Sequence, residues 1–114
     1  MLFQGIKEMS FRYMRVMVFF DLPTETSEDI REYRKFRKML LKNGFLMMQK
    51  SVYSKLVLNA TAANTVMSTV RANCPVLGLV QMLTVTEKQY NNIEIVIGDN
   101  SSEVINSTDK LVIL

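Results

Sequence analysis

The sequence predicts an α+β domain whose elements follow the order β-α-β-β-α-β, with further short strands at the carboxyl end. Two observations support this fold class. The segment Tyr13–Asp21, with five consecutive apolar residues at Val16–Phe20, is typical of a strand that is buried on both faces of a sheet. Two segments, 27–42 and 60–74, carry apolar residues every three or four positions, as amphipathic helices do, and strand-like segments follow each of them. A length of 114 residues suits one domain with its own buried core.

The segment Tyr13–Asp21 is too short to span a membrane and too continuous for a strand with one solvated face. Because side chains alternate along a strand, its residues divide between two faces. One face carries Met14, Val16, Val18 and Phe20, and the other carries Tyr13, Arg15, Met17, Phe19 and Asp21. The strand therefore ends in a carboxylate at the rim of the second face, directly before a Leu-Pro break.

A helix is expected to begin near Ser27. Thr26 and Asp29, three residues apart, resemble a capping box with Asp in place of Glu, and acidic residues fill the first turn. Asn43 and Gly44 end the helix in the usual carboxyl-terminal way. One arc of this helix is apolar and is expected to face the sheet: Ile30, Tyr33, Phe36, Leu40 and Leu41.

A different arc of the same helix is basic and carries Arg31, Arg34, Lys35, Lys38 and Lys42. Two interpretations are open. The arc is a solvated face in which Glu28 and Glu32 pair with neighbouring cations, each pair contributing roughly a few tenths of a kcal/mol. Alternatively, it is a row of contacts to nucleic-acid phosphates, since cations outnumber the acids available to them. Arg37, at the edge of the apolar arc, could extend its charge to solvent, to a dimer partner or to a ligand.

The middle of the chain is expected to contain two strands and a second helix. The strands are 45–48 and 51–58, joined at Gln49-Lys50, and the second of them alternates in polarity. Asn59 starts a helix whose apolar positions recur at helical spacing and which Pro75 stops. Cys74 lies on the apolar face of this helix, so it is most simply a core residue.

Further strands are expected near the carboxyl end of the chain. The pattern predicts strands at Leu77–Thr86 and Ile93–Ile97 separated by a helical turn at Glu87–Tyr90, and a polar loop at Gly98–Asp109 before a last short strand at Lys110–Leu114. The overall order indicates a ferredoxin-like sheet with both helices on one face and the first strand in its interior. The opposite face then needs a cover, and we expect a second copy of the chain, in a homodimer, to provide it.

Composition excludes several classes of function. Cys74 is the single cysteine and there is no histidine, so an intramolecular disulfide, the usual zinc sites and Ser-His-Asp or Cys-His catalysis are all ruled out. Residues 1–58 hold 11 of the 14 Lys and Arg with 6 acids, whereas residues 59–114 hold 3 with 5 acids. The first half is therefore net basic, a mild bias that permits binding to nucleic acid.

The chain is expected to be cytoplasmic and not to associate with a membrane, because it has no signal peptide and no apolar run near about 18 residues. The sequence LFQG near its start resembles the recognition site of a viral 3C-type protease. We therefore interpret residues 1–8 as an expression-derived or disordered leader, and residues 9–114 as a single domain.

Asp21 is the candidate acid with the most distinctive position. On sequence alone it is either an Asx-type turn residue before Leu-Pro or a functional carboxylate. One aspartate is a poor metal site. Two copies that meet across a two-fold axis would pair two carboxylates, and such an oxygen-rich site suits magnesium.

Several segments resemble the CRISPR-associated Cas-two family. The shared pattern is an Asp at the end of the first strand, here Asp21, a helix containing YRKFRK, and a glycine followed by Q-x-S-V-[FY], here Gly44 and Gln49–Tyr53. The segments TVTEKQY and LVIL resemble the branch that accompanies type II-A systems. The resemblance covers residues 9–114, and its parts occur in the expected order.

The resemblance implies a ferredoxin-like homodimer whose carboxyl-terminal strand lies on the partner's sheet. It also implies a role in CRISPR antiviral defense, in spacer acquisition, where the family's dimer lies between two dimers of the Cas-one integrase and spans double-stranded prespacer DNA. The basic residues of the first helix are our candidates for DNA contacts: Arg31, Arg34, Lys35, Arg37, Lys38 and Lys42.

The alternative is a magnesium-dependent endonuclease of RNA or DNA, since some family members are described as holding the metal with the strand-one Asp pair. Asp21 matches that metal-binding and catalytic position, and Tyr53 matches the aromatic of the motif, a second catalytic candidate. Family members with nuclease activity commonly carry Arg two residues before the motif Gln, where this chain has Met47. Absence of that cation weakens transition-state stabilisation and favours the structural role. A ferredoxin-like RNA-binding or regulatory domain is disfavoured, because the strands lack the exposed aromatic motifs of such domains.

Overall fold

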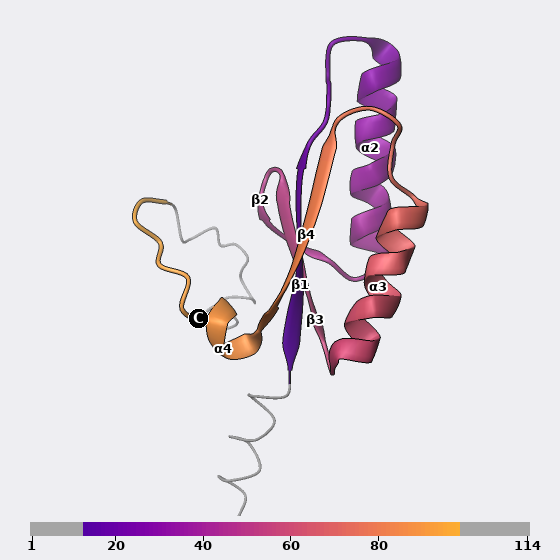
Figure 1. The fold of residues 1–114 in the computed structure, drawn as a ribbon. Coiled ribbons are helices and arrows are strands. Elements are labelled where there is room, and N and C mark those ends of the chain that lie inside the picture. The colour runs from indigo at the N-terminus through magenta and orange to yellow at the C-terminus, as the bar shows by residue number, and fades with distance from the viewer. Residues whose placement is uncertain (1–12, 99–114) are drawn as a thin grey trace, which may run out of the picture.

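The structure, a computed structural model, describes residues 13–98. Within them it confirms the predicted α+β order (Figure 1). The elements are β1 (Met14–Asp21), α2 (Ser27–Lys42), β2 (Leu46–Gln49), β3 (Val52–Val57), α3 (Ala60–Ala72), β4 (Leu79–Thr86) and α4 (Glu87–Tyr90). The four strands form one antiparallel sheet in the order β2-β3-β1-β4, consistent with a ferredoxin-like arrangement. Helices α2 and α3 both pack on the same face of this sheet (Figure 1).

The core lies between the sheet and these two helices, and β1 runs through its centre. Val16 and Val18 are fully buried, as expected for an interior strand. The Phe20 ring makes an edge contact with Phe36 of α2 at 5.1 Å between ring centroids and lies 5.7 Å from the Tyr53 ring of β3. Such aromatic contacts contribute beyond their buried area, so the end of β1 is held firmly beneath α2.

Both ends of α2 follow the sequence prediction. The Thr26 hydroxyl accepts a hydrogen bond from the Asp29 N–H at 3.0 Å, and the Asp29 carboxylate accepts one from the Thr26 N–H at 3.1 Å, which completes the capping box. At the other end, Asn43 is the cap and Gly44 turns the chain with φ +88°. The helix therefore has a defined register, and its faces are set by residue number.

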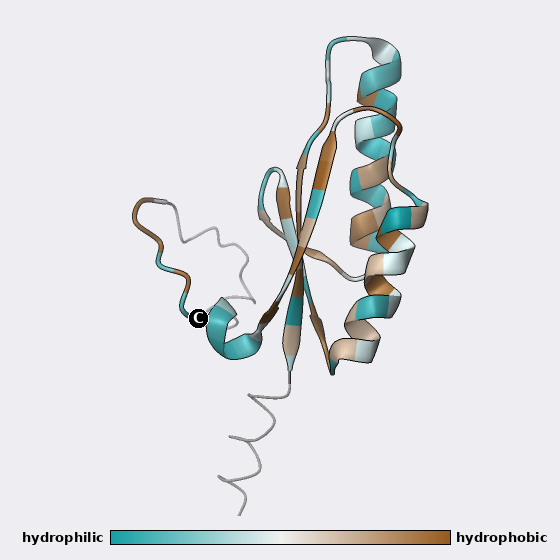
Figure 2. Cartoon of the chain, viewed as in Figure 1, coloured by the Kyte–Doolittle hydropathy of each residue, from teal (hydrophilic) through white to brown (hydrophobic). Residues whose placement is uncertain are grey.

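The sheet face away from the helices is apolar and partly uncovered. Strand pairing places one set of side chains on it, which we call the open face: Met17, Phe19, Leu46, Val52, Leu56, Leu79, Leu83 and Val85. Leu46 is 65% exposed and Leu79 is 55% exposed. Ser54 lies among these side chains, and its hydroxyl is buried without a hydrogen-bond partner in the described part of the chain. Hydrophobic colouring continues along the strands and into the segment after α4 (Figure 2).

One end of the open face is covered by α4. The Arg15 guanidinium forms two hydrogen bonds to the Glu87 carboxylate, at 2.8 and 3.2 Å, and lies 4.2 Å from the centre of the Tyr90 ring. The Glu87 N–H also donates to the carbonyl of Tyr13 at 3.0 Å. Each side chain of the ion pair is 16% exposed, so Arg15 holds α4 against the start of β1 through a mostly buried contact.

Two predictions about single residues or segments were wrong. The segment Ile93–Ile97 is not a strand here: it follows α4 without pairing to the sheet, and Val96 and Ile97 are 86% and 90% exposed. A strand needs a hydrogen-bonded neighbour, and this segment has none among residues 13–98. Cys74 is exposed because it lies past the last residue of α3, Ala72, where its thiol donates a hydrogen bond to the Val70 carbonyl at 3.2 Å. Partial burial of the thiol nevertheless raises the pKa of Cys74.

Some predictions hold only in part, and others concern residues outside the described range. Ile30 and Leu41, at the margins of the apolar arc of α2, are 38% and 41% exposed, whereas Phe36 and Leu40 at its centre are buried. The proposed leader at 1–8 and the proposed strand at 110–114 lie outside the described residues. None of the helices in the described part of the chain is long and apolar enough to cross a bilayer.

Candidate nucleic-acid interface

A groove of about 690 Å³ opens at the carboxyl end of β1, between the amino-terminal half of α2 and the β2–β3 turn. We call it the cationic groove. Three of its lining side chains are cations and one is a carboxylate, and the rest are apolar or hydroxylic. Its lining residues are Asp21, Leu22, Thr24, Ile30, Tyr33, Arg34, Arg37, Met47, Lys50 and Ser51.

Helical spacing brings two of the cations into the groove. Arg34 and Arg37 follow Ile30 by four and seven residues, so at about 100° per residue all three lie on one face of α2. Lys50 arrives from the opposite side, on the β2–β3 turn. The Phe20 N–H donates to the Ser51 carbonyl at 3.0 Å, and this hydrogen bond holds the turn against the end of β1. Residues that are far apart in sequence therefore share one surface.

The charges in the groove are available to a ligand. Asp21, Arg34, Arg37 and Lys50 are all exposed, and none of them forms an ion pair with another residue of the 13–98 region. With three cations and one carboxylate, the groove has a net positive charge.

The predicted basic arc is thus divided between two faces of α2. Arg31 pairs with Glu28 at 2.5 Å, as the solvated interpretation expects, and both side chains are well exposed. Lys35, Lys38 and Lys42 are exposed and lie away from the cationic groove. Arg34 turns into the groove beside Arg37, which the sequence places apart from the arc. The arc is therefore not one surface, and contact of its residues with phosphates stays a prediction.

Lys50 is a groove residue that the sequence analysis missed. The sequence predicts only a turn between strands at this position, and a lysine in a turn is ordinarily solvated. Its place in the motif, one residue after Gln49, could have identified it. This place puts Lys50 in the hairpin turn, and a hairpin turn next to an interior strand must lie close to the end of that strand.

Tyr53 does not reach the groove. Its ring is fully buried in the core, beneath the helices, and its hydroxyl has no hydrogen-bond partner within the described structure. The two catalytic candidates, Asp21 and Tyr53, are therefore not brought together in this chain. Tyr53 instead packs against Phe20 and supports the end of β1.

One copy of the chain offers too few oxygen ligands at this groove to bind a divalent metal. Magnesium is held by several oxygen ligands, and Asp21 is the only carboxylate among the described residues that line the groove. No group of three or more metal-binding side chains occurs among residues 13–98. The three neighbouring cations oppose binding of another positive charge. A magnesium site at Asp21 would therefore require a carboxylate from a second copy.

These features define a class of protein: a small α+β domain with a ferredoxin-like strand order, one open apolar sheet face and a cationic groove at the end of its first strand. The chain belongs to the Cas2 family, since the family model described as CRISPR associated protein Cas2 matches residues 14–93. This finding confirms the family that the motifs around Asp21 and Gln49 indicate.

Curated relatives agree. The chain is 54% identical over 101 residues to a protein of Treponema denticola, covering 89% of this chain and all of that protein. It is 46% identical over 101 residues to a protein of Ligilactobacillus salivarius, again covering 89% of this chain and all of the relative. A Streptococcus mutans protein is 45% identical over the same length, with 89% of this chain and 93% of the relative covered. Each of the three is named CRISPR-associated endoribonuclease Cas2.

Proposed function

We propose that this chain is a structural subunit of the CRISPR adaptation complex: a homodimer that bridges two Cas-one integrase dimers and binds the backbone of double-stranded prespacer DNA. The observation that carries the proposal is the meeting of Arg34, Arg37 and Lys50 in one groove, without ion pairs to other residues of the 13–98 region. Exposed cations of this kind suit contacts to phosphate rather than to base edges.

The spacing of the groove arginines supports a nucleic-acid backbone as their ligand. Arg34 and Arg37 are three positions apart on α2, or about 4.5 Å along the helix axis. One strand of B-form DNA presents a phosphate about every 3.4 Å along its axis, so these two arginines suit neighbouring phosphates of one strand. The binding is then independent of sequence and weakens steeply with salt.

The open face supports the homodimer. Its exposed leucines form an apolar surface that a monomer rarely leaves uncovered, and within the described residues the buried Ser54 hydroxyl has no partner there. A second copy that packs on this face removes apolar area from water on both chains. It also offers the exposed segment Ile93–Ile97 a neighbouring sheet to pair with.

Neutralising the groove tests the DNA contacts. We expect Arg34→Gln with Lys50→Gln to reduce the magnitude of the negative slope of log K against log salt concentration by about 2 for each copy whose groove contacts the duplex, close to 0.9 for each phosphate no longer neutralised. The matched control, Lys55→Gln with Arg71→Gln, makes the same change in net charge on β3 and α3 and should leave the slope within about 0.5. Equal slopes in the two variants would refute the groove as the DNA site.

A second candidate function is a magnesium-dependent endonuclease that uses two Asp21 carboxylates across the dimer. Two observations favour it: Asp21 is exposed at the rim of the open face, and the relatives carry endoribonuclease names. Asp21→Ala separates the two functions. The structural role predicts that complex assembly and spacer acquisition persist in this variant, whereas the nuclease predicts loss of a magnesium-dependent cleavage that EDTA also abolishes. Failure of acquisition in a well-folded Asp21→Ala protein contradicts the structural role, and cleavage that survives EDTA contradicts the nuclease.

A further inference from the structure

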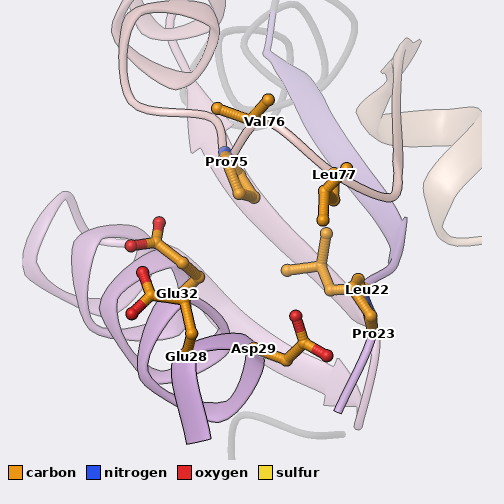
Figure 3. Close-up of a pocket in the computed structure, with 8 residues that line it drawn as sticks. All are labelled: Leu22, Pro23, Glu28, Asp29, Glu32, Pro75, Val76 and Leu77. Carbon is orange, nitrogen blue, oxygen red and sulfur yellow. The ribbon is translucent and has the colours of Figure 1, made fainter. Parts of the chain in front are cut away.

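A second hollow, of about 220 Å³, lies beside the first turns of α2 and shares only Leu22 with the cationic groove (Figure 3). We call it the acidic hollow. Its apolar wall comes from two connections, β1–α2 and α3–β4, which contribute Leu22, Pro75 and Leu77 among others. Its other wall is α2, which presents the carboxylates of Glu28, Asp29 and Glu32 (Figure 3). The hollow therefore combines an apolar surface with negative charge.

The apolar wall is preformed. Gly78 has φ +104°, and a Cβ there would lie 2.7 Å from Leu22 Cδ2 and 2.8 Å from the Asp21 carbonyl oxygen. The α3–β4 connection thus sits directly on the end of β1. Val76 and Leu77 are nevertheless 97% and 63% exposed, so their apolar surface faces outward from a seated loop. A ligand that covers them does not have to order the loop first.

The three carboxylates differ in what they already bind. Asp29 accepts hydrogen bonds from the Glu25 and Thr26 N–H groups and is committed to the helix cap. Glu28 pairs with Arg31 on the exposed side. Glu32 forms no ion pair and accepts no side-chain hydrogen bond within residues 13–98. Its carboxylate is therefore the free acceptor beside the apolar wall.

Charge complementarity selects the occupant. A polyanion is attracted to the cationic groove and repelled by this site. We infer that the acidic hollow binds a segment of a partner protein in which an aliphatic side chain, of leucine, isoleucine or methionine size, stands next to a lysine or arginine. The aliphatic side chain packs against Leu22 and Leu77, and the cation meets Glu32. The volume suffices, because a cavity of about 150 Å³ already admits a benzene-sized group.

The test uses the full chain and a random peptide library displayed on phage. Peptides are selected on the wild-type protein and counter-selected on the double variant Glu32→Gln, Val76→Ser, which changes two surface side chains. We expect enriched peptides to carry an aliphatic residue adjacent to Lys or Arg. A synthetic peptide of the enriched sequence should bind each single variant about three- to tenfold more weakly than wild type by fluorescence anisotropy.

Several outcomes overturn the inference. They are enrichment of no peptide specific to wild type, enrichment of peptides without cations, and equal affinity for wild type and both variants. A change of oligomeric state in Val76→Ser, seen by sedimentation, would assign the hollow to a second copy of this chain instead. Duplex DNA binding serves as the control: it should stay within about twofold in both variants, because neither residue lines the cationic groove. Failure here is thus distinguishable from failure of the proposed function.

Discussion

Gly78→Ala is expected to destabilise this fold more than the same substitution at Gly44. Gly78 and Gly44 have φ values of +104° and +88°, a region that L side chains rarely adopt. What a Cβ would meet differs between them. At Gly78 it meets the Asp21 carbonyl oxygen at 2.8 Å, which is backbone of an interior strand, whereas at Gly44 it meets the end of the Lys55 side chain, which can move away.

The two positions separate two contributions to the free energy of unfolding. The left-handed backbone costs alanine about 1–2 kcal/mol at either site, offset in part by the lower entropy of the unfolded chain. The overlap with backbone at Gly78 adds about 1–3 kcal/mol, in the range of an overpacked core, because β1 is paired on both sides and cannot shift alone. We therefore expect Gly44→Ala to cost about 1 kcal/mol and Gly78→Ala about 3 kcal/mol.

Thermal unfolding followed by circular dichroism measures this difference. The additional 2 kcal/mol or so corresponds to a Tm lower by about 10 °C in Gly78→Ala than in Gly44→Ala. Both variants are compared at one protein concentration, since Tm depends on concentration for a protein that dimerises, as proposed for this chain. An equal decrease of Tm in both would show that the close approach of the α3–β4 connection to Asp21 is not rigid, and would also contradict the preformed wall of the acidic hollow.

Three further predictions concern the ion pair between β1 and α4, an aromatic side chain of the core, and the thiol after α3. In urea unfolding, Arg15→Met should lower the free energy of unfolding by about 2 kcal/mol, because the ion pair to Glu87 is mostly buried and doubly hydrogen-bonded. Arg31→Met, at the exposed pair, should lower it by less than about 0.5 kcal/mol. Similar losses in the two variants would mean that Arg15 does not hold α4. Phe20→Leu should cost about 1–2 kcal/mol by the same measurement, because it removes the aromatic contacts, and a neutral result would refute their role. Burial raises the pKa of the Cys74 thiol, so less thiolate is present at a given pH. Alkylation of Cys74 by iodoacetamide should therefore reach half its maximal rate at a higher pH in the folded protein than in urea. Coincident pH profiles would contradict this.

Much of the fold could be predicted from the sequence because it depends on neighbours in the chain. Five consecutive apolar residues identify β1 as an interior strand, and the structure buries Val16 and Val18 completely. Thr26 and Asp29 set the start of α2 through hydrogen bonds that span only three residues. Local periodicity and caps carry such information in full, and the order of the elements then leaves few sheet topologies to choose from.

Predictions failed where a residue's surroundings come from distant parts of the chain. Periodicity places Cys74 on the apolar face of a helix that in fact ends two residues earlier, and the residue is exposed past that end. Ile93–Ile97 has the composition of a strand, but composition does not supply the hydrogen-bonded neighbour that a strand requires. In both cases the apolar pattern of the sequence continues beyond the last residue of the regular helix or strand.

The sequence by itself determined the element order, the interior position of β1, the limits of α2 and the membership in the Cas2 family. Only the tertiary structure decided which charges meet. Arg34 and Arg37 line the same groove as Asp21 while Lys35 and Lys38 do not, and Lys50 joins them because the Phe20–Ser51 hydrogen bond holds the β2–β3 turn at the end of β1. The physical reason is that helical phase fixes the angle between side chains on one element, whereas the meeting of two elements depends on how the sheet and helix pack.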